Sequence, residues 1–378
     1  MVAAFNLDPV YDCPPEGFAV KSSRIQEDER RHIVKWHSTE VALSVKRWQF
    51  WLGILVSIVF LYPSLKGLHL DEVWHYLATA KYWWIIPGVL VYFVGVGIRT
   101  WRWHYMLRPL RSIPMRSLFP IVCIGYFGNN IYPARAGEIL RAYVLKRKEN
   151  VAISASLATI LVERIFDGLV MLLFVALALP FAPSLAGYRR FIILLSVAFL
   201  VALAVFFWAA IQPHVIRQVY GALAERFLPT KIRTSLDDIV ERFLEGIHFL
   251  RRPQDVLMIF LTSVFVWLAE TVKYWFVMHA FPFTVPFIVL MLMNGIVNLA
   301  TTLPAAPGYV GTFDTPGIAV LVTFGVDQDL ATGYTWVLHA ALWLPITLLG
   351  AYYMWREHLR WQDIEKAERL ANVATETL

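Results

Sequence analysis

The sequence predicts an all-α membrane protein that crosses the bilayer several times. Of its 378 residues 58% are hydrophobic and only 16% are charged, against about 25% charged in an ordinary soluble domain. The charges are unevenly spread, and the uncharged stretches 168–188, 191–215 and 274–313 exceed the roughly 18 apolar residues that indicate a membrane-spanning helix. A soluble enzyme, a nucleic-acid-binding module and a disulfide scaffold are therefore excluded as primary interpretations.

The charges at the ends of each span indicate its orientation, because basic residues gather in cytoplasmic loops and the orientation alternates with every crossing. The start of the chain lacks the basic and apolar segments of a signal peptide, so we expect residues 1–47 to form a cytoplasmic tail. The membrane domain is predicted at 48–355, with six full spans near 48–65, 82–100, 151–180, 191–212, 256–279 and 331–355. Residues 213–255 form a basic cytoplasmic loop that contains an amphipathic helix at 236–249, and residues 356–378 form a second cytoplasmic tail.

Two apolar segments are interrupted by proline and glycine, which break a helix in mid-stretch. The first, residues 117–134, has arginine on both flanks. We predict a re-entrant hairpin that enters and leaves on the cytoplasmic side, with its broken backbone enclosed by protein. The second lies in 274–313 and continues to about 324; it is a second hairpin or two ordinary crossings, which the charge rule does not separate. The predicted breaks are Pro133, Gly137, Pro304, Pro307 and Gly308.

The two breaks share the pattern Pro-Ala-x-x-Gly, and each follows two predicted spans and precedes one. The halves 48–180 and 191–355 start on opposite sides of the membrane, so we predict inverted-topology repeats. Such repeats, with discontinuous helices that meet near the midplane, are typical of secondary transporters, whose substrate lies at the repeat interface. The predicted fold class is therefore an all-α polytopic membrane protein with about six full transmembrane helices plus two re-entrant helical hairpins.

Ionisable residues at bilayer depth are the candidates for function, because each costs about 2.5–3.5 kcal/mol there unless it is paired or hydrated. Freed backbone N–H groups at a helix start and an arginine fork suit a phosphate group. We expect a substrate site formed by Asn129, Asn130, Arg135, Glu138, Arg141, Glu163, Arg164, Asp167, Asn298 and Asp314. The alternative is structural pairing of Arg135 or Arg141 with Glu163 or Asp167. Glu270 and Lys273, three residues apart, are candidates for an ion pair.

The sequence contains no nucleotide-binding or hydrolase motif, and no His/Cys cluster has metal-ligand spacing. We therefore expect no cofactor, no metal and no catalytic residues, and we predict that the protein is not an enzyme. Cys13 lies in a polar tail and Cys123 in an apolar segment, which argues against a disulfide. The expected partners are membrane lipids, with a phospholipid or lipid-linked substrate and no nucleic acid; homo-oligomerisation is left open.

Three motifs follow one another along the chain: Gly-Asn-Asn-Ile-Tyr-Pro-Ala-Arg-Ala-Gly-Glu at 128–138, Glu-Arg-Ile-Phe-Asp-Gly at 163–168 and Pro-Ala-Ala-Pro-Gly-Tyr-Val-Gly at 304–311. Together they resemble the lysylphosphatidylglycerol synthase transmembrane family, a flippase-like domain, over roughly residues 48–355. The resemblance implies lipid translocation between leaflets. The residues that match the family's motif positions are Asn130, Arg135, Gly137, Glu138, Glu163, Arg164, Asp167, Pro307 and Gly308.

The resemblance is to a stand-alone member, because the chain ends soon after the last predicted span without a cytoplasmic synthase domain. The headgroup of the longer proteins is therefore not carried over. We expect a lipid transporter of the bacterial cytoplasmic membrane with both termini in the cytoplasm, which moves an anionic-headgroup lipid through a cavity between the repeats. Two alternatives are an integral-membrane transferase that modifies a lipid headgroup and a non-transporting membrane assembly subunit.

Overall fold

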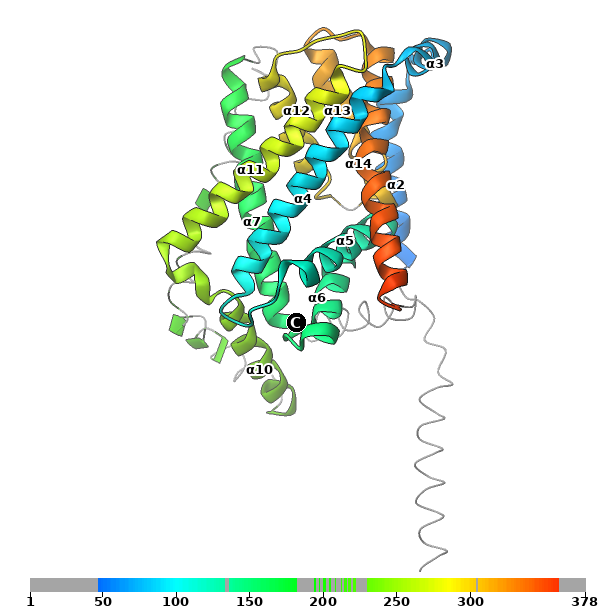
Figure 1. Cartoon of the computed structure of the whole chain (residues 1–378). Helices are drawn as coiled ribbons and strands as arrows, with labels where there is room; N and C mark the ends of the chain where they lie inside the picture. Colours follow the sequence, from blue (N-terminus) through cyan, green and yellow to red (C-terminus); the bar gives the residue numbers. More distant parts are fainter. Residues whose placement is uncertain are drawn as a thin grey trace, which may run out of the picture. The chain divides into compact units, whose positions relative to one another are not determined.

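The computed structural model describes residues 47–132, 136–181, 230–303 and 305–359, together with scattered positions between 194 and 221. Within these residues every regular element is a helix (Figure 1). Most of the two predicted tails and of the predicted span at 191–212 lies outside the described residues. The same holds for Pro133, Arg135 and Pro304.

The described part of the first predicted half contains six α-helices and two short 3-10 helices. A long apolar helix comes first and an amphipathic helix follows. Along the chain, the two helices that flank the first break are then preceded by one longer helix and followed by another. In chain order these are α2 (Arg47–Leu65), α3 (Leu70–Thr79), η1 (Tyr82–Trp84), α4 (Ile85–Leu107), α5 (Met115–Ile131), α6 (Ala136–Glu149), α7 (Ile153–Ala178) and η3 (Leu179–Phe181).

The described part of the second half repeats this mixture of long and short helices. Its elements are α10 (Thr230–Gly246), η5 (His248–Arg251), α11 (Pro253–Met278), α12 (Phe287–Ala300), η6 (Pro307–Tyr309), α13 (Asp314–Thr323) and α14 (Gln328–Arg356). The short helices α12 and α13 lie on either side of the second break.

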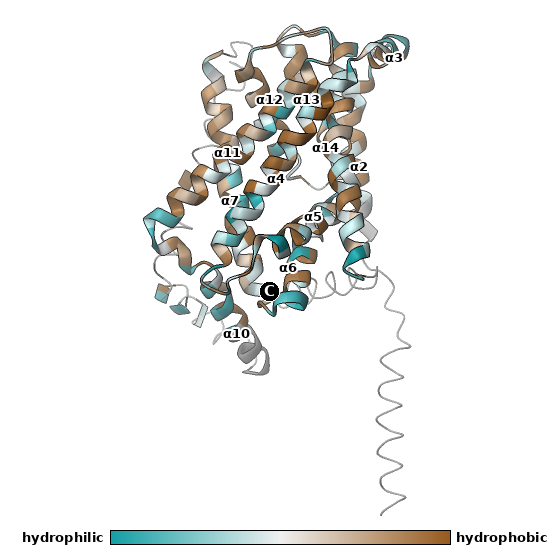
Figure 2. Cartoon of the chain, viewed as in Figure 1, coloured by the Kyte–Doolittle hydropathy of each residue, from teal (hydrophilic) through white to brown (hydrophobic). Residues whose placement is uncertain are grey.

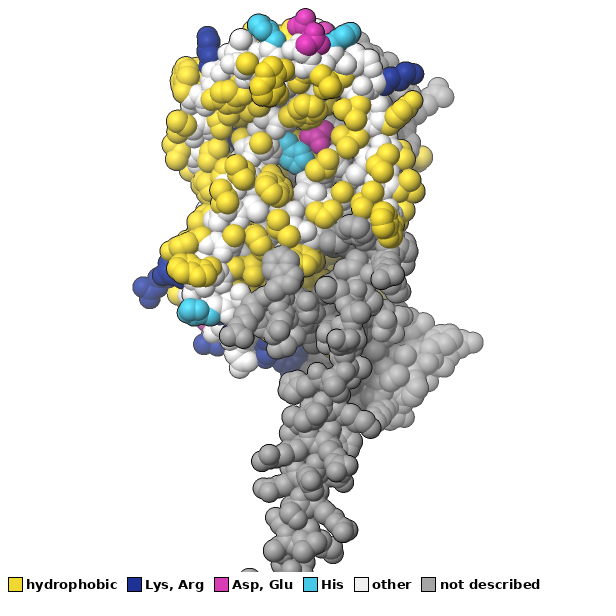
Figure 3. Space-filling view, turned by 90° about the vertical axis from the view of Figure 1, so that its right-hand side faces the viewer, with side chains coloured by type: hydrophobic (Ala, Val, Ile, Leu, Met, Phe, Trp, Pro, Cys, Tyr) yellow, Lys and Arg dark blue, Asp and Glu magenta, His cyan; other side chains and the backbone are white. Residues whose placement is uncertain are grey.

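Three segments of the described chain are long and apolar enough to cross a membrane: Tyr82–Leu107, Pro253–Met278 and Gln328–Arg356. Figure 2 shows hydrophobic residues along much of α4 and α11, and hydrophilic residues at α3 and at α10. On the face in Figure 3, hydrophobic side chains cover the middle, and Lys and Arg lie towards its two ends. This distribution is that of a helical membrane protein, as the composition predicts.

Two helices differ from the sequence-based expectation. Residues 66–81, which connect the first two predicted spans, contain the unpredicted helix α3, whose first turn carries Asp71 and Glu72 and whose Val73 is buried. Acidic residues favour a helix N-terminus. The amphipathic helix expected at 236–249 is α10, which begins earlier, at Thr230, and ends at Gly246. A Cβ on Gly246 would lie 2.5 Å from the backbone oxygen of Ala155, so α10 packs closely against α7.

The helices beside the two breaks are short. At about 1.5 Å per residue, α5, α6, α12 and α13, with 17, 14, 14 and 10 residues, are roughly 15–26 Å long, less than the ~30 Å hydrocarbon core. α5 and α6 pack backbone to backbone, because a Cβ on Gly137 would lie 1.9 Å from the oxygen of Gly125. The short helices therefore pair with one another, and the long ones surround them.

The long helix α14 joins two hydrophobic cores. Leu338 belongs to one core, with residues of α11, α12 and α13, and Ile346 belongs to the other, with residues of α4, α5, α6 and α7. The interval between them carries His339 and Trp343, which are partly buried. Both side chains line pockets, so this interval of α14 is where the site lies.

Candidate functional site

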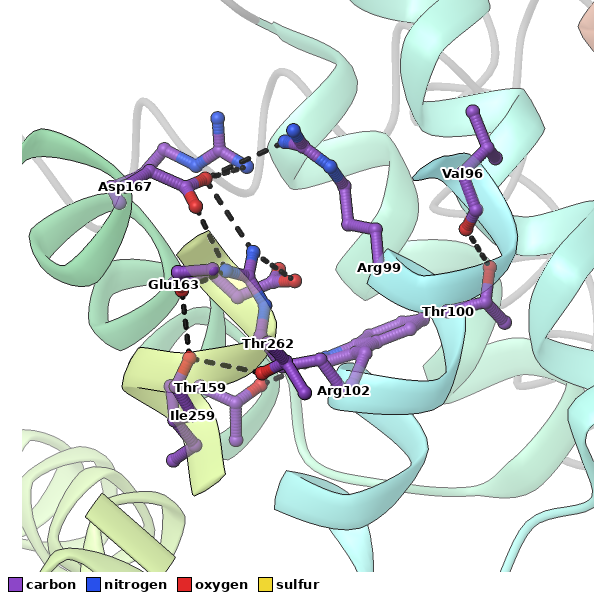
Figure 4. A network of polar contacts seen from close by, with 12 residues as sticks. Val96, Arg99, Thr100, Arg102, Thr159, Glu163, Asp167, Ile259 and Thr262 are labelled. Carbon is purple, nitrogen blue, oxygen red and sulfur yellow. Dashed lines mark hydrogen bonds and ion pairs between the residues drawn. The ribbon is translucent and has the colours of Figure 1, made fainter. Parts of the chain in front are cut away.

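A buried cluster of charged side chains lies between α4, α7 and α11 (Figure 4). Its central acceptor is Asp167, whose Oδ1 accepts hydrogen bonds from Arg102 Nη1 at 2.8 Å and from Trp267 Nε1 at 3.0 Å. Oδ2 of the same carboxylate lies 3.5 Å from Arg99 Nη1 and 3.3 Å from Arg164 Nη2. Three arginines thus converge on one carboxylate.

Glu163, one helical turn before Asp167, is the second acceptor of the cluster and contacts Arg102 and Arg141. Its Oε1 lies 3.2 Å from Arg102 Nη2, and its Oε2 accepts a hydrogen bond from Arg141 Nη1 at 2.6 Å. The guanidinium carbon of Arg141 also lies 3.5 Å from the ring centre of Trp103. Arg102 and Glu163 are fully buried. An unpaired charge at such a position would be strongly destabilising, so these contacts fix the geometry.

The described part of the cluster holds more positive than negative charge. Glu138 joins it through its Oε1, 3.6 Å from Arg164 Nε. Among the described residues, the cluster contains four guanidinium groups, on Arg99, Arg102, Arg141 and Arg164, and three carboxylates, on Glu138, Glu163 and Asp167. The excess of one positive charge, at a depth where charge is costly, favours an anion nearby.

A pocket of about 130 Å³, the central pocket, lies against this cluster. Arg99 and Arg164 line it, whereas Arg102 and Arg141 do not. The other lining residues are mostly aromatic or polar, with a few aliphatic ones: Tyr92, Tyr126, Asn129, Asn130, Trp267, Glu270, Tyr274, Asn298, Thr301, Gly308, Tyr309, Phe313, His339, Leu342, Trp343 and Ile346. The side chain of Arg164 is 29% exposed and that of Arg99 is 7% exposed. Arg164 is therefore the cation most open to the pocket.

A second pocket of about 620 Å³, the lateral pocket, lies beside the central pocket and is mainly apolar. Its lining residues are Leu61, Leu65, Asn130, Ile131, Pro307, Gly308, Val310, Asp314, Trp336, His339, Ala340 and Trp343. Leu65 and Val310 are exposed on the surface. Figure 3 shows a histidine and an acidic side chain at a hollow within a hydrophobic face. The lateral pocket thus combines a hydrocarbon-compatible wall with a small polar end.

Both breaks meet one face of α14 at the wall that the two pockets share. His339, Trp343 and Thr347 follow at intervals of four residues, so they lie on that face. Asn130 Nδ2, from the end of α5, donates to Thr347 Oγ1 at 2.7 Å, and Trp343 Nε1 donates to the backbone oxygen of Asn130 at 3.4 Å. His339 Nε2 lies 2.8 Å from the backbone oxygen of Gly308 in η6. This stripe holds the two breaks beside each other.

The predicted substrate residues fall into three groups in the structure. Asn129, Asn130, Arg164 and Asn298 line the central pocket, and Asp314 lines the lateral pocket. Glu138, Arg141, Glu163 and Asp167 belong to the charged cluster instead. Arg135 lies outside the described residues. Glu270 and Lys273 form an ion pair, with Oε1 and Nζ 2.8 Å apart, and Glu270 also lines the central pocket.

Sequence reasoning missed Arg99 and Arg102, because the predicted span ends near residue 100 and both arginines were interpreted as part of its basic cytoplasmic flank. The helix continues to Leu107 instead, and both arginines are buried. A signal was present, because Tyr92, Val96, Arg99 and Trp103 recur at helical spacing on one face. No group of three His, Cys, Asp or Glu side chains in the described part of the chain is arranged to hold a metal ion.

Comparison with known proteins finds relatives in archaea. A protein of Methanothermobacter thermautotrophicus named UPF0104 membrane protein is 29% identical, with 82% of this chain and 93% of that protein covered. A UPF0104 membrane protein of Methanocaldococcus jannaschii is 22% identical, with 79% and 91% covered. Glycosyltransferase AglD of Haloferax volcanii is 24% identical, with 83% of this chain and 55% of that protein covered.

The third relative corrects one expectation. The sequence predicted that the protein is not an enzyme, and this prediction is wrong on the comparison, because a protein that matches most of this chain is named a glycosyltransferase. Enzymes therefore occur among its relatives.

The sequence profile described as the Lysylphosphatidylglycerol synthase TM region matches residues 50–350. That match extends over most of the chain and includes both breaks and the charged cluster, so the chain belongs to this family of membrane proteins.

Proposed function

We propose that this protein moves lipids between the two leaflets of the membrane. The observation that carries the proposal is the adjacency of the two pockets: a polar pocket lined by Arg99 and Arg164 shares Asn130, His339 and Trp343 with an apolar pocket. A lipid has the same division into a polar headgroup and hydrocarbon. In the proposed complex the headgroup occupies the central pocket, and the acyl chains extend through the lateral pocket towards the bilayer.

The headgroup that fits the central pocket carries an anion. Arg164 and Arg99 offer guanidinium forks, which bind phosphate oxygens in pairs. The rings of Tyr126 and Trp267 lie 5.7 and 5.1 Å from the guanidinium carbon of Arg99, so they orient it. Arg141 and Glu163 are assigned a positioning role rather than direct contact, because they pair with each other and neither lines the central pocket. Asn129 and Asn298 supply amides for the remaining polar groups of the lipid.

The proposed architecture has six full spans and two re-entrant hairpins, α5–α6 and α12–α13, in inverted halves. The shortness of these four helices supports the hairpins. The contacts of Asn130 with Thr347 and of Gly308 with His339 support a meeting of the two breaks within the membrane. Both termini are proposed to be cytoplasmic, on the basis of the basic loops.

The test is lipid movement in proteoliposomes. The full chain is reconstituted with fluorescent lipids that differ in headgroup, and a membrane-impermeant quencher reports the fraction that changes leaflet. Wild-type protein is expected to accelerate at least one anionic lipid. Arg164→Gln is expected to slow it at least tenfold, about the loss of one charge-assisted hydrogen bond. Arg108→Gln, which changes an exposed arginine at the end of α4, serves as the matched control. Movement no faster than in empty vesicles for every headgroup would contradict the proposal.

A second candidate function is transfer of a group onto a lipid headgroup. It is favoured by the relative named glycosyltransferase and by Glu270, a carboxylate in a pocket rich in aromatic and amide groups. Incubation of the reconstituted protein with acceptor lipid and labelled activated sugars distinguishes the two. A labelled lipid product that Glu270→Gln abolishes, without protein-dependent leaflet exchange, would favour transfer over transport.

A further inference from the structure

Through its two ring nitrogens, His339 of α14 contacts both the second break, at Gly308, and the start of α13, at Asp314. Nε2 lies 2.8 Å from the backbone oxygen of Gly308, and Nδ1 lies 2.8 Å from Oδ1 of Asp314. The other oxygen of Asp314, Oδ2, accepts the backbone N–H of Gly311 at 2.9 Å. The ring of Phe313 lies against the imidazole, with centroids 4.5 Å apart. The side chain of His339 is 15% exposed and that of Asp314 is 5% exposed.

This arrangement fixes the number of protons that the pair holds. A backbone carbonyl only accepts, so Nε2 of His339 must carry a hydrogen. A neutral imidazole has one N–H, which leaves Nδ1 without a hydrogen opposite Asp314. The second contact therefore requires one further proton, either on Nδ1 or on Oδ1. In both forms the pair is neutral overall, as imidazolium with carboxylate or as imidazole with carboxylic acid.

Without that proton the two contacts compete. A neutral ring has one hydrogen, which serves either Asp314 from Nδ1 or the oxygen of Gly308 from Nε2. Since the charged Oδ1 of Asp314 is the stronger acceptor, the contact with Gly308 is the one that is lost. The loop depends on these contacts, because Gly308, Tyr309 and Gly311 have φ of 74°, 61° and 85°. Tyr309 is not a glycine, so its positive φ is strained and persists only where the surroundings hold the chain in place.

We propose that His339 and Asp314 form a proton-binding site that controls the wall between the central and lateral pockets. With the proton bound, Gly308 is held on α14 and the wall is closed. When the proton leaves, the loop 307–311 is released and the two pockets join. The site thereby couples lipid movement to the binding of a proton. This role in coupling rests on the proposed lipid transport, whereas binding of the proton does not.

The described titratable and charged side chains that line the two pockets with His339 come from several elements, and Asp314 is the one at hydrogen-bonding distance from its Nδ1. α4 and α7 contribute Arg99 and Arg164, α11 contributes Glu270 and Tyr274, and tyrosines come from α4, α5 and η6. From α2 the lateral pocket receives Leu61 and Leu65, and Ser57 of that helix accepts the backbone N–H of Ala306 at 3.0 Å.

Asparagine at position 314 gives a sharp test. Its amide nitrogen can donate to Nδ1 while its oxygen still accepts from Gly311, so both contacts of His339 persist without the extra proton. Ring-15N NMR of the histidine-labelled full chain in lipid nanodiscs, from about pH 5 to 9, reports the hydrogens on each nitrogen. The wild-type resonances of His339, identified by their absence in His339→Gln, are expected to change with pH, and those of Asp314→Asn to stay constant. Constant resonances of His339 in the wild type would overturn the inference.

Lipid movement in proteoliposomes tests the coupling with variants of opposite effect. The wild-type rate is expected to rise at least tenfold with pH as the proton leaves. Asp314→Asn should stay slow at every pH, and His339→Ala, which removes both contacts, should be fast at every pH. His69→Gln is the matched control, because His69 also pairs with a carboxylate, Asp329 at 3.1 Å, but is 72% exposed.

The outcomes separate the inference from the function on which it rests. A wild type that moves no lipid at any pH refutes the proposed function, and the NMR titration still decides whether the proton site exists. A wild type that moves lipid at a rate independent of pH refutes the coupling. Equal loss of movement in Asp314→Asn and His339→Ala also refutes it, because a purely structural role predicts that result.

Discussion

Replacement of Asp167 by asparagine perturbs the charged cluster at its most connected point. The carboxylate accepts hydrogen bonds from Arg102 and Trp267 and neutralises Arg99 and Arg164. The variant keeps the shape but leaves four guanidinium groups against two carboxylates, with an amide N–H₂ facing arginine donors. Breaking a buried ion pair costs about 3–5 kcal/mol, a large part of the ~5–15 kcal/mol that stabilises a typical protein. At roughly 2 °C per kcal/mol for a chain of this size, we expect a loss of about 6–10 °C in apparent Tm.

The assay is thermal stability of the detergent-purified full chain, measured as the temperature at which half of the protein leaves the monodisperse chromatographic peak. Glu245→Gln is the matched control, because it makes the same chemical change at an exposed position of α10. The double variant Asp167→Asn with Arg99→Gln restores the charge difference of one and should recover part of the loss. An apparent Tm of Asp167→Asn within about 2 °C of the wild type would refute the idea that the cluster depends on this carboxylate.

Two further predictions concern packing and pH. Gly137→Ala places a methyl group 1.9 Å from the oxygen of Gly125 and should abolish the monodisperse folded protein. Gly97→Ala, with no neighbouring atom within 4 Å of the added carbon, should not. Equal yields of monodisperse protein from the two variants would contradict the close approach of α5 and α6. In the exposed pair of Arg217 and Glu241, the hydrogen bond from Arg217 lowers the pKa of Glu241. The pair therefore adds stability above the unfolded pKa of about 4.3 and loses it as pH falls further. Glu241→Gln should lower the apparent Tm slightly at pH 7, and the difference should vanish once the pH falls below the lowered pKa of Glu241. A difference that grows in acid would refute this assignment.

Much of the membrane architecture could be read from local sequence. Uncharged length predicted the helices α4, α11 and α14 to within a few residues at most ends. The helices α5 and α12 end a few residues before the predicted breaks, at Ile131 and Ala300, whereas Gly137 lies inside α6. The helical spacing of Glu163 and Asp167 placed both carboxylates on one face, as the structure has them. What local spacing could not supply was the partner of each charge. Arg99 contacts Asp167 across 68 residues of sequence, and no periodicity relates two helices that far apart.

The sequence by itself determined that this chain is a helical membrane protein, because the hydrophobic effect and the cost of buried charge act on composition and on the spacing of residues along one helix. Its motifs also indicated the family. The tertiary structure alone decided which arginines face a pocket. Arg141 is held by Glu163 and Trp103, while Arg99 and Arg164 line the central pocket. It also brought His339 to Gly308 and Asp314. The physical reason is that ion pairs and hydrogen bonds act over a few ångströms, and only the packing of helices sets which groups come that close.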